Sequence, residues 1–408
     1  MDEATKIKIL NSIDHVEFLN ARYAILMKKC GNVFKSNCPF HEEKTSSFTL
    51  FPANQKNKWP TMKCFGCGKF VNLIDLVMEK EGLSFIEACK ILGGYIGMEI
   101  STTPKNPIHE QYKETMTQHG RRYCRTLATD NAKLDYLRNE RGLTDLTLST
   151  FGIGATPTDE FRYRSDMGYI NDRIAFPIFE HKLPGDAKVV AMGYRTLKDK
   201  DPNYDKDKDP KYINDKNTSG DLDGVFTKGQ YLYGYPQAFQ EIRRNNYAVV
   251  VEGYVDVLSM HQAGMINTVG VLSASLTKQQ MEALKSLTKY LIFFLDSDEV
   301  GMNSMMKTIP TLLQEGFIVK VIMADGGKDP ADLCVKKKFD NAQVKGYIMT
   351  NAVSALDYMI DFHTKQYQNY VSKERSRILN TIMPIIDMCQ GYEREVARDT
   401  LLKKIDMK

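Results

Sequence analysis

The sequence predicts a multidomain protein that combines α/β and α+β architecture. Its 408 residues, 42% of them hydrophobic, are sufficient for two or three separate cores. Between residues 247 and 332, three apolar runs alternate with helix-like segments, a pattern typical of strands buried in a parallel sheet. Residues 341–408 carry apolar positions at helical spacing instead. We therefore expect a parallel sheet at residues 245–340, followed by a C-terminal helical segment.

The charge of the chain is nearly balanced, whereas its cysteines are clustered. The formal net charge is +4, from 55 basic and 51 acidic residues, so it neither predicts nor excludes a nucleic-acid partner. No apolar stretch is long enough to cross a bilayer and the N-terminus lacks a signal-peptide pattern, so we expect a cytoplasmic protein without membrane contact. Four of the eight cysteines lie near the N-terminus, which in such a chain favours metal over disulfides.

Two pairs of candidate metal ligands have matching spacing in the first hundred residues. Cys38 and His41 form one pair, and Cys64 and Cys67 form the other. A structural zinc ion takes four such ligands in a tetrahedron. The alternative, ordinary buried thiols, does not account for two pairs of the same spacing. We therefore predict a zinc-binding domain over residues 1–98.

Basic and aromatic residues are interleaved around the predicted zinc site, a combination suited to single-stranded nucleic acid because rings stack on bases and lysines meet phosphates. They are Lys44, Phe48, Phe51, Lys56, Lys58, Trp59, Lys63, Phe65 and Lys69. For Phe48 and Phe65 we favour the alternative that they fill the small core around the metal. Residues 1–25 are expected to be helical, and residues 72–92 to form one or two helices that break near Gly82.

A second, mixed α+β region is predicted over residues 111–244, after a linker at 99–110 whose composition is rich in proline and small polar residues. A long helix is expected from about Ile108, and strands at 173–178 and 189–195. Residues 198–216 hold six lysines and six aspartates, so we interpret most of them as a solvated loop rather than a basic patch.

Each apolar run between residues 247 and 332 ends in acidic residues. Glu252 follows the first run, Asp296 and Asp298 follow the second, and Asp329 lies beyond the third. Right-handed crossovers place the carboxyl ends of parallel strands at one edge of the sheet, where ligands bind. Gathering like charges there favours a divalent ion such as Mg²⁺, which prefers oxygen ligands.

Simpler interpretations exist for individual residues of this segment. Asp298 and Asp329 precede helical segments, where carboxylates stabilise free amides as N-caps. Capping can explain one acid but not three acidic strand ends, so we favour metal binding. Tyr254 invites interpretation as the nucleophile of a topoisomerase, but we interpret it as a packing residue. His261 is interpreted as a helix-surface or core histidine.

Three groups of motifs in this chain resemble the bacterial DnaG-type DNA primase family. Residues 38–48 with 64–68 are similar to its zinc-binding domain, which is zinc-ribbon-like. Residues 136–144, 173–178 and 211–214 resemble the basic subdomain of its polymerase domain. Residues 250–257 and 296–301 resemble its Toprim fold, which is a Rossmann-like parallel sheet. The motifs occur in family order over about residues 6–340. Toprim domains also occur in topoisomerases, nucleases and repair proteins, so the combination carries the resemblance.

The resemblance implies a DNA primase, which makes short RNA primers on single-stranded DNA from ribonucleoside triphosphates. It implies one structural Zn²⁺ and catalytic Mg²⁺ or Mn²⁺. The metal-binding acids that it implies are Glu252, Asp296 and Asp298, with Asp256 and Asp329 in support. The template- or nucleotide-binding residues that it implies are Arg141, Arg195, Lys211, Asn214 and Lys228.

The chain departs from the family pattern in four places. The loop between His41 and Cys64 is longer than is typical. Ala331 stands where a second acid is frequent and Asp332 comes one residue later, so Asp332 is left out of the ligand set. Residues 273–275 replace the usual Gly-Thr. The chain also ends near the close of the polymerase domain, so the usual helicase-binding domain is expected to be absent, although a replicative helicase is a candidate partner. The alternatives are a Toprim-type nuclease or topoisomerase-like enzyme, and a zinc-bearing DNA-binding protein with an inactive sheet.

Overall fold

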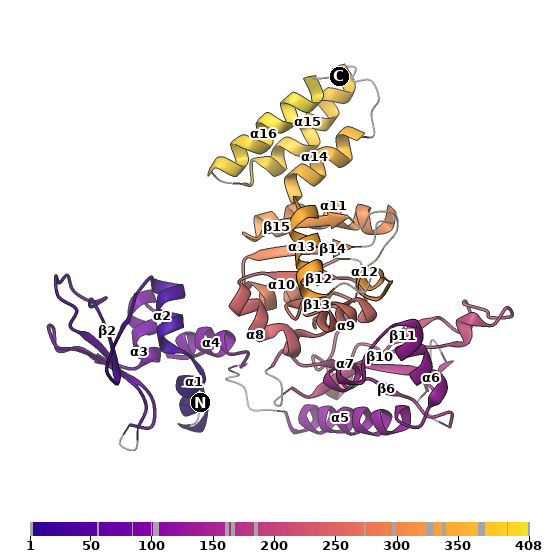
Figure 1. The fold of residues 1–408 in the computed structure, drawn as a ribbon, viewed down its shortest axis with the longest axis horizontal. Helices are drawn as coiled ribbons and strands as arrows, with labels where there is room; N and C mark the ends of the chain where they lie inside the picture. Colours follow the sequence, from indigo (N-terminus) through magenta and orange to yellow (C-terminus); the bar gives the residue numbers. More distant parts are fainter. Residues whose placement is uncertain are drawn as a thin grey trace. The chain divides into compact units, whose positions relative to one another are not determined.

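The structure, a computed structural model, divides into two compact units, Met1–Lys105 and Asn106–Lys408 (Figure 1). Both combine helices and sheets, which confirms the predicted fold class. The residues that the structure describes are 3–54, 57–83, 85–98, 100, 106–159, 163–164, 168–182, 187–272, 275–295, 299–323, 330–336, 340–365, 372–389 and 391–406. Among them, no helix has the length and apolar character needed to cross a membrane.

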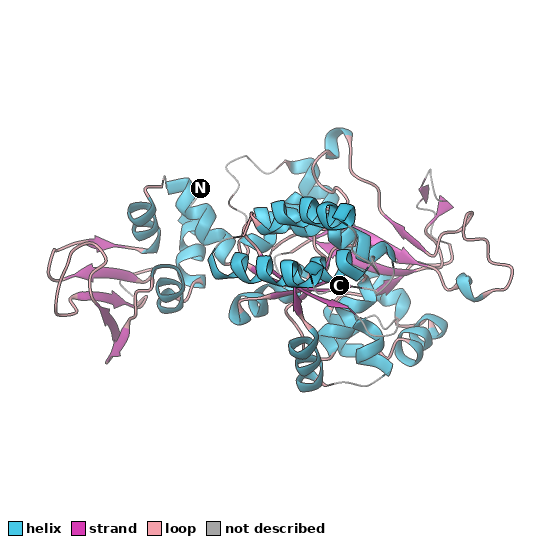
Figure 2. Cartoon of the chain, turned by 90° about the horizontal axis from the view of Figure 1, so that it is seen from above, coloured by secondary structure: helices cyan, strands magenta, loops and turns pink. Residues whose placement is uncertain are grey.

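The first unit is an antiparallel five-stranded sheet whose strands follow chain order, with helices on one side of it (Figure 2). Its strands are β1 (Lys28–Cys30), β2 (Val33–Ser36), β3 (Phe48–Phe51), β4 (Thr61–Cys64) and β5 (Phe70–Val71). Its helices are α1 (Glu3–Ser12), α2 (His15–Tyr23), α3 (Leu73–Glu81) and α4 (Phe85–Tyr95). One sheet face and the helices share a core that includes Phe18, Phe48 and Met62.

Local sequence signals explain where these helices begin and end. The helix expected over residues 1–25 is two helices, because the Asp14 side chain accepts from the Glu17 N–H and starts α2 afresh. The break expected near Gly82 is confirmed: this residue ends α3 with a φ of 66°, in the left-handed region that glycine tolerates best.

The second unit begins with α5 (Pro107–Leu127), which starts inside the predicted linker because Asn106 caps it and proline occupies its first position. The helix packs on a four-stranded antiparallel sheet of order β11-β10-β9-β6. These strands are β6 (Gly154–Ala155), β9 (Ile174–Phe179), β10 (Val189–Arg195) and β11 (Tyr212–Asn214). The smaller elements are α6 (Asn131–Asp135), the π-helix η1 (Tyr136–Glu140), α7 (Asp145–Thr150), the hairpin β7 (Tyr163–Arg164) and β8 (Gly168–Tyr169), η2 (Lys198–Lys200) and η3 (Gly220–Leu222).

A second sheet in this unit has the order β13-β12-β14-β15-β16, parallel except for its last strand. Its strands are β12 (Ala248–Val251), β13 (Thr268–Gly270), β14 (Tyr290–Leu295), β15 (Ile318–Met323) and β16 (Val353–Ser354). The three apolar runs of the sequence are thus β12, β14 and β15, as predicted. Its helices are α8 (Tyr235–Asn245), α9 (Tyr254–Gln262), α10 (Lys278–Lys285), α11 (Glu299–Gln314), α12 (Pro330–Lys336) and α13 (Asn341–Asn351).

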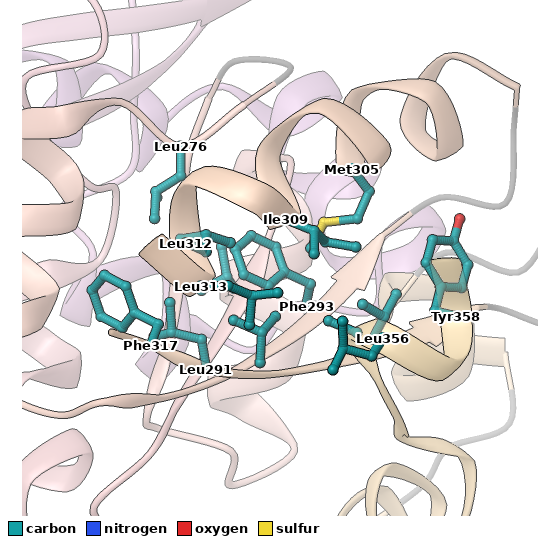
Figure 3. Packing of buried hydrophobic residues seen from close by; sticks show 14 of the residues in the cluster. Leu276, Leu291, Phe293, Met305, Ile309, Leu312, Leu313, Phe317, Leu356 and Tyr358 are labelled. Atoms are coloured by element: carbon teal, nitrogen blue, oxygen red, sulfur yellow. The ribbon is translucent and has the colours of Figure 1, made fainter. Parts of the chain in front are cut away.

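Both faces of the parallel sheet are buried, which explains why its strands are continuous apolar runs. Leu291 and Phe293 of β14 pack on one face with Ile309 and Leu312 of α11 (Figure 3). Phe294 packs in the core of the opposite face. The C-terminal helices α14 (Ala355–Lys365), α15 (Ser372–Ile386) and α16 (Gly391–Asp406) extend the first of these cores. The sheet therefore has a hydrophobic scaffold on either side.

Candidate metal sites and basic groove

The four predicted zinc ligands converge in the first unit. The ligand atoms of Cys38, His41, Cys64 and Cys67 all lie within 4.8 Å of one another. The Sγ atoms of Cys38 and Cys67 are 3.9 Å apart, as are Cys64 Sγ and His41 Nδ1. Three thiols and one imidazole at such separations are the donor set of a structural zinc site. The residues therefore fit a zinc ion.

Glu43, which the sequence analysis did not single out, lies directly behind these ligands. Its carboxylate accepts hydrogen bonds from the backbone N–H groups of Cys38 at 2.7 Å and Ser47 at 3.0 Å. The same carboxylate lies 3.3 Å from His41 Nε2, which leaves Nδ1 facing Cys64. A hydrogen bond from the Ser47 hydroxyl lowers the pKa of Glu43, with further lowering from backbone N–H groups. Such a carboxylate orients the histidine ring for metal binding.

The environment of Cys64 favours its thiolate form, which is the metal-binding form. Burial raises its pKa, but the contact between Ser47 Oγ and Cys64 Sγ at 3.1 Å and a hydrogen bond from the Cys67 N–H more than offset this and lower the pKa to about 6. Zinc binds thiolates rather than thiols. The geometry and the hydrogen bonding at this position therefore agree.

The face of this sheet that points away from the core carries aromatic rings. Phe65 and Phe70 are each 63% exposed, whereas Phe48 is fully buried. The interpretation of Phe48 as a core residue is therefore confirmed and that of Phe65 is wrong, because Phe65 follows the last residue of β4 and turns outward. Lys63 Nζ lies 5.3 Å from the Phe65 ring centre, and Lys63 pairs with Phe70 across β4 and β5. Lys63 thus stands beside two exposed rings on this face.

The described acidic residues at the carboxyl edge of the parallel sheet are Glu252, Asp256 and Asp332. Glu252 directly follows β12, and its backbone carbonyl accepts from the Leu272 N–H at 3.1 Å. Asp256 lies in the first turn of α9, where its Oδ2 accepts from the Gly253 N–H at 2.9 Å as part of an N-terminal cap. Asp332 lies in the first turn of α12.

The other predicted acids, Asp296, Asp298 and Asp329, lie outside the described residues. The strands that precede them are described. Val250 of β12 pairs in parallel with Phe293 of β14, and Leu295 of β14 pairs with Met323 of β15. The strands β12, β14 and β15 therefore end at the same edge of the sheet, as the sequence predicts.

Tyr254 links the parallel sheet to the antiparallel sheet. Its hydroxyl donates to Asn214 Oδ1 on β11 at 2.6 Å, and its ring stacks on Phe176 at 4.7 Å. The side chain is 5% exposed, and burial raises its pKa. A β-carbon at Gly193 of β10 would come within 2.2 Å of the Tyr254 hydroxyl, so this close approach requires glycine there. These contacts are those of a packing residue.

Several predicted nucleic-acid-binding residues gather around two tyrosines. Arg141 Nε donates to the Tyr136 hydroxyl at 2.6 Å. The guanidinium of Arg195 lies 4.4 Å from the Tyr136 ring centre and 5.8 Å from that of Tyr212. Asn214 lies two residues beyond Tyr212 on the same strand. We call the neighbourhood of Tyr136, Arg141, Arg195, Lys211 and Tyr212 the basic groove.

The members of the basic groove differ in accessibility. Arg195 is only 2% exposed and reaches Asp199 at 3.1 Å and the Thr196 carbonyl at 2.8 Å. Lys211 is half exposed, with its Nζ 3.4 Å from the same aspartate. Tyr212 is 37% exposed. Lys228 is exposed in the loop before α8, where its N–H donates to Asn217. Lys211 and Tyr212 therefore offer accessible groups, and Arg195 lies beneath them.

Three residues of this region were not identified from the sequence. Tyr136 begins a π-helix, a local geometry that propensities do not reveal. Asp199 was assigned to a solvated loop, but its side chain is 13% exposed. Further along that loop, Asp209 pairs with Arg173, which is 2% exposed, while Asp209 itself is 35% exposed. The solvated interpretation, which was made for most of the loop, is therefore wrong for Asp199. The alternation of charges along it was the signal, and composition alone cannot show which acids turn inward.

Comparison with known proteins agrees with this arrangement. Residues 2–107 match a family described as the CHC2 zinc finger, and residues 249–334 one described as Toprim-like. The chain is 30% identical to the DNA primase of Clostridium acetobutylicum, over 100% of this chain and 67% of that protein. It is 29% identical to the DNA primase of Pasteurella multocida, over 97% of this chain and 70% of that protein.

Solved structures share the fold at lower identity. The zinc-binding and RNA polymerase domains of the Aquifex aeolicus primase match with a TM-score of 0.56 at 23% identity, covering all of both chains. A DnaG primase catalytic domain bound to single-stranded DNA matches with a TM-score of 0.60 at 23% identity, covering 74% of this chain and 98% of that one. The predicted zinc-binding and Toprim folds are thus confirmed.

Proposed function

The chain belongs to the bacterial DnaG-type DNA primase family, and we propose which of its residues bind the template, the nucleotides and the catalytic metal. A DNA primase makes short RNA primers by nucleotidyl transfer. The observation that carries the assignment is the hydrogen bond between Tyr254 and Asn214. This bond connects α9, which begins just after Glu252, to β11, which carries Tyr212. It therefore links the acidic edge to the basic groove.

The acidic edge of the parallel sheet is proposed to bind Mg²⁺ or Mn²⁺ through Glu252, Asp296 and Asp298, with Asp256 and Asp329 in support. Carboxylates are the oxygen ligands that such hard cations prefer, and three of them follow strands that end together. When bound, the ions activate the attacking 3′-hydroxyl and neutralise the charge that develops on the phosphates. Asp256 also caps α9, so its proposed role is to hold the backbone next to Glu252.

The basic groove is proposed to bind the template strand and the incoming ribonucleoside triphosphate. Lys211 offers an ammonium group for phosphate, and the exposed ring of Tyr212 offers a face for a base. Arg141, Asn214 and Lys228 are proposed to contact the same ligands. Arg195 is buried beneath Tyr212, so we assign it two roles. It supports the rings of Tyr136 and Tyr212, and its charge makes the local electrostatic potential more positive.

Tyr254 is proposed as a positioning residue. Its hydroxyl holds Asn214 and its ring fills the space between the two sheets, so a shift there changes the distance from groove to acidic edge. Nucleotidyl transfer depends strongly on such distances. Its burial and raised pKa do not suit a nucleophile, which disfavours the topoisomerase-like alternative.

The zinc-binding domain is proposed to contact the template near the start site. Phe65 and Phe70 are exposed rings beside Lys63, which is the combination that binds single strands by stacking and charge. The zinc ion fixes Cys64 and Cys67, and so the turn that carries Phe65. A replicative helicase is the further partner that we propose, since primers are needed where a duplex has just opened.

A primer-synthesis assay tests the proposed function. Single-stranded DNA, ribonucleotides and Mg²⁺ or Mn²⁺ should yield short RNA with the unmodified chain. Glu252→Gln should reduce the yield by roughly 10³-fold, which corresponds to about 4 kcal/mol of lost transition-state stabilisation. The exposed Glu42→Gln is the control, since that residue belongs to the first unit and is not one of the proposed ligands of the catalytic metal. Synthesis undiminished in Glu252→Gln would overturn the assignment of the metal site.

A further inference from the structure

A pocket in the first unit gathers lysines that the template and metal assignments leave unused. It has a volume of about 470 Å³ and lies beside the zinc ligands, where α2 ends and the β1–β2 hairpin meets α3. Among its lining residues are Tyr23, Leu26, Lys28, Lys35, Asn37 and Lys80. No acidic side chain lines it among the described residues. We call it the lysine pocket.

The two lysines of the hairpin face each other without a counter-charge. Lys28 of β1 is the direct cross-strand partner of Lys35 of β2, and both are exposed. Like charges directly opposite each other destabilise a strand pair. Among the described contacts, neither ammonium forms an ion pair with a carboxylate. This arrangement is therefore unfavourable for the fold, and a bound anion would relieve it.

The third lysine comes from a different element and is also available. Lys80 of α3 donates to the Pro39 carbonyl at 3.2 Å, a neutral acceptor. Its chain neighbour Glu81 does not neutralise it, because Arg22 engages that carboxylate through two hydrogen bonds of 2.6 and 2.8 Å. Asn37 and Ser46 add polar groups that already bond to each other at 2.8 Å. The pocket therefore presents three lysine ammonium groups beside the hydrogen-bonded side chains of Asn37 and Ser46.

We propose that the lysine pocket binds the terminal 5′-triphosphate of the nucleotide that starts a primer. The proposal rests on the primase function. In the first step, the 3′-oxygen of the starting nucleotide bonds to the α-phosphorus of the second nucleotide. Pyrophosphate leaves from the second nucleotide, and the hydroxyl proton passes to solvent. The starting nucleotide keeps its own triphosphate, which remains at the 5′ end of the RNA.

The charge and shape of the pocket favour this ligand over a template strand. A triphosphate concentrates several negative charges within one group, whereas a DNA strand carries a single charge on each successive phosphate. Three lysines around one pocket match the first distribution. The exposed rings of Phe65 and Phe70, by contrast, suit bases. The first unit would thus hold the 5′ end of the product and the template at separate places.

Equilibrium binding tests the proposal without requiring catalysis. The zinc-loaded full chain is titrated against 3′-labelled RNA trinucleotides that carry either a 5′-triphosphate or a 5′-hydroxyl, and binding is followed by fluorescence anisotropy. We expect the triphosphate to bind more tightly, and the double variant Lys28→Gln with Lys35→Gln to lose about tenfold of that affinity. Arginine at both positions should retain it. Lys90→Gln, an exposed lysine on α4, is the matched control.

The outcomes separate this proposal from the function on which it rests. The triphosphate site would be overturned if the double variant lost the same affinity for both RNAs. It would also be overturned if the double variant had a normal zinc content and lost no affinity for the triphosphate RNA. Competition by free ATP would identify the free starting nucleotide as the ligand, and its absence would identify the RNA end. In the primer assay, the unmodified chain should extend 5′-triphosphorylated RNA in preference to 5′-hydroxyl RNA, and the variant should lose that preference. A chain that makes no RNA on any template would refute the primase function, while the binding result stands by itself.

Discussion

The zinc site and the acidic edge of the parallel sheet, which is the proposed site of the catalytic metal, are built in opposite ways. The four zinc ligands lie on short segments around a small core, and Cys64 is itself a fully buried core residue. Glu252 instead follows a strand that is hydrogen-bonded on both sides and packed on both faces. Cys38, His41 and Cys67 of the first site stand outside the strands, whereas the strand before Glu252 is held by neighbours on both sides.

This difference separates structural from catalytic metal binding. Where the ligands are part of the core, the free energy of binding the metal is also free energy of folding. Where the ligands stand at the edge of a sheet that folds without the metal, repulsion between their like charges costs little stability. The metal then contributes to catalysis rather than to folding. Substitutions at the two sites should therefore affect different properties of the protein.

The largest expected effect is the loss of the first unit on Cys64→Ser. Structural zinc contributes about 10–16 kcal/mol in small domains, which exceeds the stability of most domains of about 5–15 kcal/mol. We expect zinc content to fall and residues 1–105 to become sensitive to protease, while the melting of residues 106–408 is unchanged. Glu252→Gln should show the reverse pattern, with activity lost and both melting transitions retained. A protease-resistant first unit in Cys64→Ser without zinc would contradict the distinction.

Acid should destabilise the second unit through histidines, independently of zinc. Burial lowers the pKa of His181 to about 3 and that of His261 to about 4, below the unfolded value of about 6.5. His181 Nε2 accepts from the Leu232 N–H at 2.7 Å, which only the neutral ring can do. Below pH 6.5 the unfolded chain binds protons that the folded chain does not, so stability is full above pH 6.5 and falls as the pH approaches 4.

Denaturant melts of the second unit between pH 7 and 4, at several zinc concentrations, measure this effect. The loss of stability should be the same at every zinc concentration, whereas the first unit should melt earlier when zinc is scarce. Replacing His181 with glutamine, which can still accept a hydrogen bond, should flatten the pH dependence. A flat profile in the unmodified chain would refute the assignment of neutral histidines.

A smaller effect is expected from Glu43→Gln. This carboxylate lies 3.3 Å from His41 Nε2 and holds two backbone N–H groups of the zinc loop. Removing the charge of a residue that orients a metal ligand typically lowers metal affinity about 10- to 100-fold. Competition with a chelator would measure the change. The neighbouring Glu42→Gln, which is exposed, should leave zinc affinity unchanged; an equal loss in both would show a general charge effect.

The sequence predicted those features that depend on local spacing. The zinc ligands follow from two pairs of equal spacing, and β12, β14 and β15 follow from apolar runs buried on both faces. Phe65 was assigned, together with Phe48, to the small core around the metal. Its outward direction depends on the turn after β4, which spacing does not determine.

Contacts over long sequence separations could not be predicted. Arg195 is predicted to bind ligand, and the rings of Tyr136 and Tyr212 lie against its guanidinium. Tyr136 belongs to the π-helix η1 and Arg195 to β10, and these elements are far apart in sequence. The sequence shows that Arg195 is charged, but whether a charged side chain is buried depends on tertiary contacts.

The smallest expected effect concerns the contact that joins the acidic edge to the basic groove. Tyr254→Phe keeps the ring but removes the hydrogen bond to Asn214, which should cost about 0.5–1.5 kcal/mol of unfolding free energy. Thr364→Val removes a buried hydroxyl bond of 2.7 Å to the Ile360 carbonyl within α14, one of the C-terminal helices, and is the matched control. If the bond positions the groove, Tyr254→Phe alone should lower kcat/KM for primer synthesis, by a few-fold. Equal activity in both variants would reduce Tyr254 to a packing residue.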